Sequence, residues 1–175
     1  FPAALDRNGT GQREMALNAD LAACPDGARL LVVNASDPSL SLYLGSTLGL
    51  YRPDEARRLS RITMLSVAPQ DHVVSTIDDH TIEVSMTTDA RIATSLPRVY
   101  SDEALEPGDV FAIEGMRVDI LEARGGLWTR ARFTFDEPLA QSCVARWDGE
   151  RLIAEAAPPP SQPRVVPFAA GPMGM

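Results

Sequence analysis

A Gly-Gly pair with strand-like flanks constrains the fold of this chain more than any other feature of its sequence. If Gly125 and Gly126 form a two-residue turn, one face of the hairpin is apolar and the other is largely charged or polar. The apolar pairs are Met116 with Phe135, Val118 with Phe133 and Ile120 with Ala131; the other face pairs Arg117 with Thr134, Asp119 with Arg132 and Leu121 with Arg130. A slip of one residue would mix the two faces, so the turn and the pattern predict a single register. We expect Asp119 and Arg132 to form an ion pair on the partly solvated face.

The first third of the chain alternates between helical and strand patterns. Apolar residues at helical spacing predict a helix over residues 12–24. A short apolar run between turn residues predicts a strand over 29–34 that is buried on both faces. Ser36 is placed to cap a second helix over residues 37–49.

From residue 61 onward apolar residues recur at every second position, which is typical of strands. Further strands are predicted over 62–67, 73–77, 82–86, 109–113, and over 143–147 paired with 151–154, with a short strand possible over 98–100. The predicted fold class is therefore α+β. An N-terminal helix-strand-helix unit would pack on an antiparallel β-sandwich or open barrel.

The domain organisation follows from length and from the distribution of proline and glycine. A chain of 175 residues has the length of one domain. We expect a linker over residues 1–11, a single α+β domain over 12–155 that is mostly β after residue 60, and a flexible Pro/Gly-rich tail over 156–175.

The charge balance excludes some partners. The chain has 24 acidic and 16 basic residues, a net charge of −8, and the basic residues do not cluster. Binding to a nucleic-acid backbone or to an anionic membrane surface is therefore not expected. No apolar run approaches the ~18–20 residues that a membrane-spanning helix needs.

Two cysteines lie 119 positions apart, at Cys24 and Cys143. This spacing fits neither a metal site nor a CxxC redox motif. Two interpretations remain open, a pair of free thiols or one long-range disulfide. A disulfide of this span would contribute about 4–5 kcal/mol.

Two histidines and one serine are further candidates for a metal or ligand site. His72 and His80 each follow an aspartate, but if they lie at the base and the tip of one hairpin they are roughly 20 Å apart, too far to share one metal ion. A strand-edge His72 and a solvated turn His80 are the simpler interpretation. Ser36 lies where a strand meets a helix, a position that suits either an anionic ligand or an ordinary helix cap. The sequence predicts no catalytic residues, no metal site and no cofactor.

A possible binding surface lies on the second strand of the hairpin. Trp128, Arg130 and Arg132 alternate onto one predicted face, and an aromatic and cationic surface suits a carbohydrate or an anionic partner. An Asp119–Arg132 pair would neutralise part of it. An ordinary sheet surface is the competing interpretation.

Several segments together resemble a known type of domain. They are PDGA at 25–28, LVVNASDP at 31–38, YL at 43–44, GD at 108–109 and FTFDEPL at 133–139. These segments are similar to the C-terminal extramembrane domain of large polytopic bacterial membrane proteins of unknown activity, over roughly residues 12–155. The resemblance implies membrane helices before Phe1 and brings no catalytic residue with it.

The functional expectation is a non-catalytic accessory or recognition domain of a membrane-anchored bacterial protein, on the extracytoplasmic side, with a cytoplasmic location as the alternative. Its partner would be the membrane-embedded part of the same protein. Two alternatives stay open: the soluble portion of a membrane glycosyltransferase-like enzyme in which Trp128 and Arg130 shape the acceptor site, and a free-standing carbohydrate- or peptide-binding β-domain.

Overall fold

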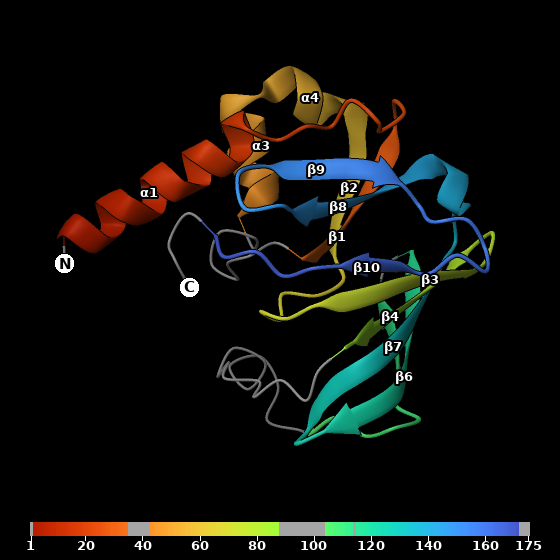
Figure 1. Ribbon diagram of the computed structural model, residues 1–175. Helices are drawn as coiled ribbons and strands as arrows, with labels where there is room; N and C mark the ends of the chain where they lie inside the picture. Colours follow the sequence, from red (N-terminus) through yellow and green to blue (C-terminus); the bar gives the residue numbers. More distant parts are fainter. Residues whose placement is uncertain (1, 35–42, 88–103, 114, 172–175) are drawn as a thin grey trace. The chain divides into compact units, whose positions relative to one another are not determined.

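The computed structural model describes residues 2–34, 43–87, 104–113 and 115–171, with side chains from residue 10 onward (Figure 1). The elements are α1 (Pro2–Leu17), β1 (Ala28–Asn34), α3 (Leu44–Tyr51), α4 (Pro53–Arg58), β2 (Leu59–Met64), β3 (His72–Asp78), β4 (Thr81–Met86), β5 (Val110–Ile113), β6 (Met116–Arg124), β7 (Leu127–Phe135), the 3-10 turn η1 (Leu139–Gln141), β8 (Ser142–Trp147), β9 (Leu152–Ala156) and β10 (Arg164–Val166). The α+β class is confirmed.

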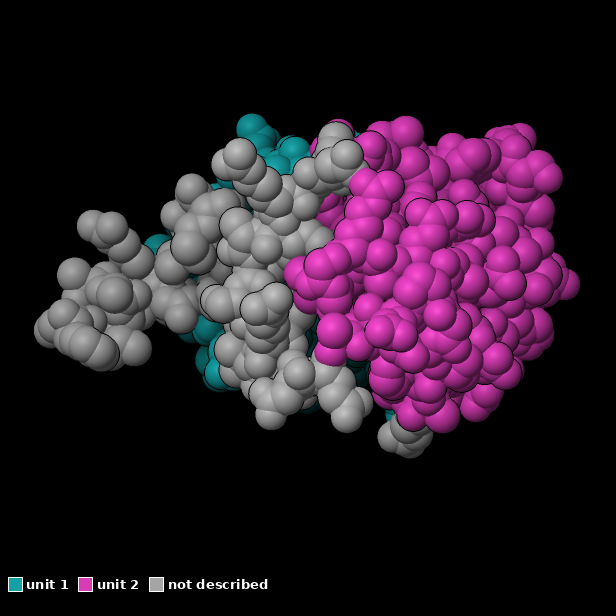
Figure 2. All heavy atoms as spheres, turned by 90° about the horizontal axis from the view of Figure 1, so that it is seen from below, with its two compact units in different colours: residues 1–69, 140–157, 167–175 teal, residues 70–139, 158–166 magenta. Residues whose placement is uncertain are grey.

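The contacts within the chain divide it into two compact units, which Figure 2 colours separately. Unit 1 comprises residues 1–69, 140–157 and 167–175, and unit 2 comprises 70–139 and 158–166. Unit 1 holds a four-stranded sheet of order β2-β1-β8-β9, and unit 2 holds a six-stranded sheet of order β10-β3-β4-β7-β6-β5. The sequence predicts one domain over 12–155, whereas each observed unit takes segments from distant parts of the chain.

The sheet of unit 1 is mixed rather than antiparallel. β1 is parallel to both of its neighbours, β2 and β8, and only β8 and β9 are antiparallel. The helices α3 and α4 lie between β1 and β2 in the chain, and such a crossover brings the second strand back parallel to the first. All seven residues of β1 are buried, as its continuous apolar run predicts. Among the described strands neither sheet closes into a barrel.

The first helix differs from the prediction at both ends. α1 already begins at Pro2, in the segment expected to be a linker, and it ends at Leu17 instead of Cys24. Glycine lowers helix propensity by only about 1 kcal/mol, so Gly9 and Gly11 do not prevent a helix. After Leu17 the backbone of Asp20 hydrogen-bonds to β9, with Asp20 N to Leu152 O at 2.7 Å and Ala154 N to Asp20 O at 2.9 Å. Pairing with a sheet edge thus replaces continuation of the helix.

The second predicted helix, over 37–49, can be compared with the structure only from residue 43 onward. α3 begins at Leu44, runs past Gly49 to Tyr51, and is followed by α4 with Pro53 in its first turn. Ser36 and residues 37–42 lie outside the described residues, as does the possible strand over 98–100. No helix among the described residues is long and apolar enough to span a bilayer.

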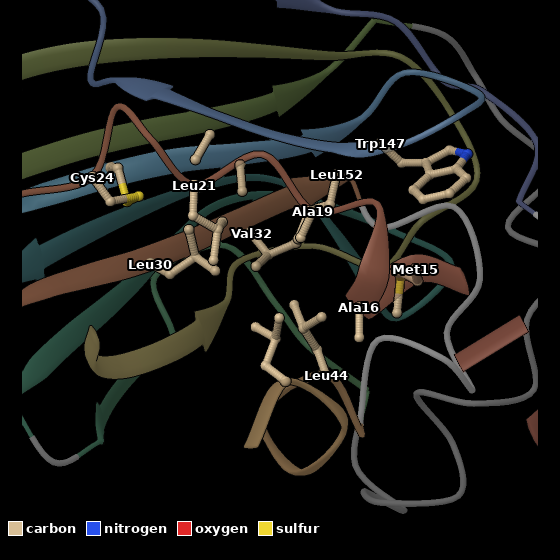
Figure 3. Packing of buried hydrophobic residues seen from close by; sticks show 14 of the residues in the cluster. Met15, Ala16, Ala19, Leu21, Cys24, Leu30, Val32, Leu44, Trp147 and Leu152 are labelled. Carbon is tan, nitrogen blue, oxygen red and sulfur yellow. A yellow bond between two sulfur atoms is a disulfide. The ribbon is translucent and has the colours of Figure 1, made fainter. Parts of the chain in front are cut away.

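The core of unit 1 lies between its sheet and the helices (Figure 3). Met15 and Ala16 of α1, Leu44 of α3 and Trp147 of β8 are all buried there. Their side chains come from segments far apart in the sequence. The core therefore fixes how α1, α3 and β8 meet within this unit.

The C-terminal segment 156–175 was predicted to be a flexible tail, and this is wrong for the described part. β10 pairs with β3 in unit 2. In unit 1 the Trp147 indole Nε1 donates to Ala170 O at 3.1 Å, and Asn34 Nδ2 donates to Pro167 O at 3.1 Å. Prolines lack an N–H but keep a carbonyl acceptor, so a Pro-rich segment is readily bound by side-chain donors.

The sheet of unit 2 is antiparallel throughout, and its hairpin has the predicted register over most of its length. The pairs from Met116–Phe135 to Ile120–Ala131 are all observed. Gly125 and Gly126 both have positive φ, as a two-residue turn of this kind needs. Gly126 also has no room for a side chain, because a Cβ there would lie 2.9 Å from the Cβ of Ala104. One pair departs from the predicted register, because Glu122, not Leu121, faces Arg130; the predicted register resumes with Ala123–Trp128 and Arg124–Leu127 beside the turn.

Candidate functional site

The structure separates Trp128 from Arg130 and Arg132. The Trp128 ring meets the ring of Phe133 edge-on, with 6.0 Å between centroids and an interplanar angle of 77°. Phe133 and Arg132 are consecutive strand residues, so their side chains lie on opposite faces. A local irregularity in the ladder between Trp128 and Ala131 accounts for the change, because it interrupts the alternation between Trp128 and the arginines. The predicted aromatic and cationic surface is therefore wrong.

The two arginines are held by one carboxylate. Glu83 of β4 has only 11% of its side chain exposed, and it accepts from Arg130 Nε at 2.6 Å and from Arg132 Nη2 at 3.2 Å. Arg130 also pairs with Glu122 at 3.3 Å. The hydrogen bonds that Arg130 donates to Glu83 and Glu122 raise the pKa of Arg130. Both guanidinium groups thus have partners within the sheet.

The predicted ion pair between Asp119 and Arg132 is also wrong. The two residues face each other in the ladder, but Asp119 pairs with Arg117 at 2.6 Å while Arg132 pairs with Glu83. β4, on the other side of β7, offers Arg132 a carboxylate that is less exposed than Asp119. The pattern of the β6–β7 hairpin alone cannot predict this contact, because β4 lies outside the hairpin.

The two histidines lie in different environments. His80 is in the turn between β3 and β4, where its Nδ1 is 3.0 Å from Phe135 O. His72, expected at a strand edge, is instead fully buried, because β10 and β4 flank β3 on either side. Burial lowers the pKa of His72 to about 4; a backbone hydrogen bond with Gln70 and the charge of Asp71 act in the opposite direction.

This burial predicts a dependence of stability on pH. The pKa of His72 is about 4 in the folded chain and about 6.5 when unfolded, so protonation favours the unfolded state. The contribution of His72 to the free energy of unfolding is fully present above pH 6.5. It falls by about 3 kcal/mol as the pH decreases through 4. Urea unfolding across this range should show a shallower pH dependence for His72→Gln than for wild type. Equal slopes for wild type and His72→Gln would contradict the assignment.

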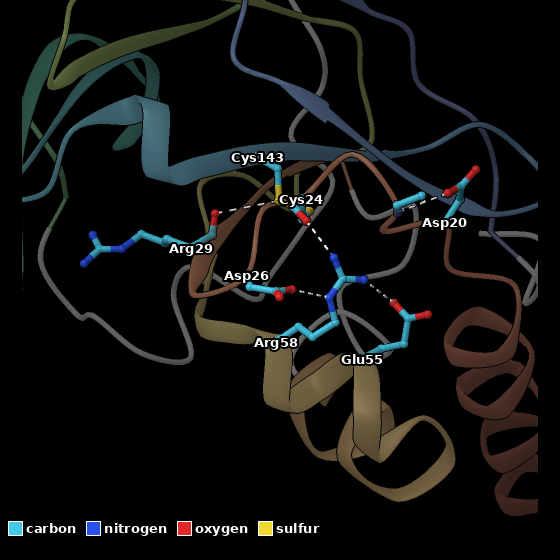
Figure 4. The surroundings of a disulfide bond; sticks show 8 residues. Asp20, Cys24, Asp26, Arg29, Glu55, Arg58 and Cys143 are labelled. Carbon is cyan, nitrogen blue, oxygen red and sulfur yellow. Dashed lines mark hydrogen bonds and ion pairs between the residues drawn. A yellow bond between two sulfur atoms is a disulfide. The ribbon is translucent and has the colours of Figure 1, made fainter.

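Of the two interpretations of the cysteines, the structure contains the disulfide. Cys24 and Cys143 are bonded, with their Cα atoms 5.4 Å apart, and both are buried (Figure 4). The bond ties the loop after α1 to β8. The carbonyl oxygen of Cys24 also accepts from Arg58 Nη2 at 3.0 Å, which links the disulfide to α4.

A cavity of about 540 Å³ lies in unit 1 beside this disulfide. We call it the arginine groove; it is lined by residues 17–22, Arg52, Glu55, Arg58, Glu150 and Arg151. The segment 17–22 is held on β9 by the backbone bonds of Asp20. The turn between β8 and β9 supplies Glu150 and Arg151, and α4 with the residue before it supplies Arg52, Glu55 and Arg58.

Two of the three arginines are held by short contacts. Arg52 donates to Ala19 O and to Glu55 Oε1, the latter at 2.5 Å. Arg58 pairs with Asp26 at 2.6 Å, and this partner raises the pKa of Arg58. Their guanidinium groups are therefore fixed in orientation.

Arg151 is held less tightly. Its guanidinium is 3.7 Å from the Asp20 carboxylate and 3.9 Å from that of Asp148, beyond hydrogen-bond distance, and 53% of the side chain is exposed. The backbone N–H groups of Glu150 and Arg151 both donate to Asp148 Oδ1 at 2.9 Å, which holds the turn that carries Arg151 and lowers the pKa of Asp148. The Arg151 side chain can therefore turn toward a ligand while its backbone remains in place.

The described residues include no group of three His, Cys, Asp or Glu side chains placed to hold a metal ion. No family model, curated protein or solved structure matches this chain.

Sequence reasoning missed the arginine groove. Its lining residues carry no motif, and they lie in three segments that only the folded chain brings together. One signal was present: residues 52–58, RPDEARR, form a short charged segment with proline in the first turn. That signal predicts an exposed helix but not what it faces.

Proposed function

We propose that this chain is a non-catalytic recognition domain of a membrane-anchored bacterial protein and that the arginine groove is its binding site. The observation that carries the proposal is Arg151, a charged side chain on a fixed turn whose ion pairs are longer than hydrogen bonds. A ligand carboxylate can take a bidentate contact from it. Arg52 and Glu55 provide a fixed donor and acceptor for the polar part of the same ligand.

The ligand class follows from the lining. The charged lining contains both signs and no aromatic ring, so a stacked sugar face or a purely anionic group gains little there. A small polar molecule that combines a carboxylate with hydroxyl or amide groups fits better. The groove is open, and few groups converge on it, so we expect an affinity near millimolar.

A matched pair of variants tests the site. Sodium glucuronate and N-acetylalanine are the probes, and glucose is the neutral comparison, each titrated into ¹⁵N-labelled protein. Arg151→Ala is expected to weaken binding of the two carboxylates about tenfold, the loss of one charge-assisted contact. Arg57→Ala removes an equally charged side chain from α4 that does not line the groove, and it should leave binding unchanged.

The result contradicts the proposal if no backbone signal of residues 17–22 or 150–151 shifts with either carboxylate, or if Arg57→Ala weakens binding as much as Arg151→Ala. Shifts with glucose of the same size as with glucuronate would remove the role given to the carboxylate.

The extracytoplasmic location is supported by the disulfide, since such bonds persist in oxidising compartments. Membrane attachment is supported by the resemblance described above. The gene sequence before Phe1 tests it: an upstream region without an apolar segment of about 20 residues would overturn this part of the proposal. Trp128 and Arg130 do not share a face, so the structure offers no support for them as a joint acceptor site.

A further inference from the structure

One edge of the sheet in unit 2 is apolar and exposed. β5 (Val110–Ile113) has β6 as its only strand neighbour among the described residues, and all four of its residues are exposed. Val110, Phe111 and Ile113 have 52%, 41% and 56% of their surface exposed. Large apolar side chains side by side on an edge strand form a candidate interaction surface.

Two of these exposed residues, Phe111 and Ile113, continue the apolar face of the sheet. Phe111 lies opposite Val118, and Ile113 lies opposite Met116, both on the buried face of β6. The next strand, β7, places Phe133 and Phe135 on the same face. The apolar row therefore runs from the interior of the sheet to β5 and remains solvent-accessible there.

β5 lacks the features that usually protect an edge strand. It contains no charged residue and no proline, and its pairing with β6 has no bulge. The opposite edge of the sheet is β10, which has three residues and begins with Arg164. Alternate residues of an edge strand direct their backbone N–H and C=O groups outward, so β5 can accept another strand.

The charges around β5 distinguish between occupants. Glu106 and Asp109 precede the strand, and in the sequence Glu114 follows it directly. A second copy of β5 carries no basic residue within Val110–Ile113 to place near these carboxylates. A strand with basic residues at both ends would instead place one of them near Asp109 in either strand direction.

We propose that β5 is a docking edge for an extended segment of a partner protein that has apolar residues at alternate positions and Lys or Arg on either side. The segment would pair its backbone with β5 and place its apolar side chains next to Phe111 and Ile113. This inference is independent of the arginine groove, which belongs to unit 1.

Fluorescence anisotropy with a labelled peptide tests the proposal on the whole chain. The probe is KKVTVTVKK, and EEVTVTVEE has the same strand pattern with the opposite charge. We expect the basic peptide to bind at least tenfold more tightly than the acidic one. Phe111→Lys should weaken its binding at least tenfold, whereas Val165→Lys, which places the same charge on the opposite edge strand, should change it less than twofold.

Thermal melting of both variants shows whether each is folded, and Phe111→Ser provides an uncharged second substitution that should also weaken binding. Equal binding of the two peptides, or equal loss in the Phe111→Lys and Val165→Lys variants, would overturn the proposal. Concentration-dependent dimerisation that Phe111→Lys abolishes, without peptide binding, would assign the edge to a second copy of the chain instead.

Discussion

Phe133→Ala is expected to lower the free energy of unfolding by about 3–5 kcal/mol. Phe133 is 5% exposed, lies opposite Val118 on β6 and Ile82 on β4, and contacts the ring of Trp128. Truncation removes the transfer energy of the ring and leaves a cavity between three strands. Because a whole domain has about 5–15 kcal/mol of stability, the sheet of unit 2 should be unfolded or close to unfolding at room temperature.

Asp119→Ala is the matched control in the same hairpin. Asp119 pairs with the exposed Arg117, and a surface pair of this kind contributes about 0–1 kcal/mol. Urea unfolding followed by circular dichroism measures both variants. A larger loss for Asp119→Ala than for Phe133→Ala would mean that the register of β6 and β7 is shifted by one residue.

The register of this hairpin was predictable because two independent signals agreed. The Gly-Gly turn fixes which residues face each other, and the alternation of Val118, Ile120, Ala131 and Phe133 fixes which face is buried. Each signal depends only on residues close to the turn in sequence. No information from the rest of the fold was needed.

The environment of the arginines was not predictable in the same way. Arg130 and Arg132 bind Glu83, which lies on a strand more than 40 residues earlier in the chain, at separations of 47 and 49 positions. A pattern within one hairpin cannot show which strand pairs with its outer edge. The position of Trp128 depends on a register shift that the alternation of side chains does not reveal.

The arginine groove was missed for a related reason. Helical spacing continued through residues 18–24, yet the backbone of Asp20 bonds to β9, more than 130 positions later in the chain. Long-range pairing of this kind overrides a weak local helical preference. The same pairing positions residues 17–22 along the groove, and a helix continued to Cys24 would not place them there.

Reduction of the Cys24–Cys143 bond is expected to destabilise unit 1 by up to about 5 kcal/mol, because the bond closes a loop with a sequence separation of 119. For a chain of this size that corresponds to a decrease in Tm of about 10–20 °C. Thermal melting with and without dithiothreitol measures the effect. The double variant Cys24→Ala, Cys143→Ala is the control, and its Tm should not respond to the reductant.

Thiol titration tests separately whether the disulfide bond forms. The two sulfur atoms are bonded to each other, so unreduced protein should show no reactive thiol even in denaturant, and reduced, denatured protein should show two. Two thiols in unreduced, denatured protein would refute the bond itself. If the bond is present but the Tm is equal before and after its reduction, the core around Trp147 and Leu152 holds the loop after α1 without the bond. The carbonyl of Cys24 would then keep its contact with Arg58, and the arginine groove would bind its carboxylate probes equally well in both redox states.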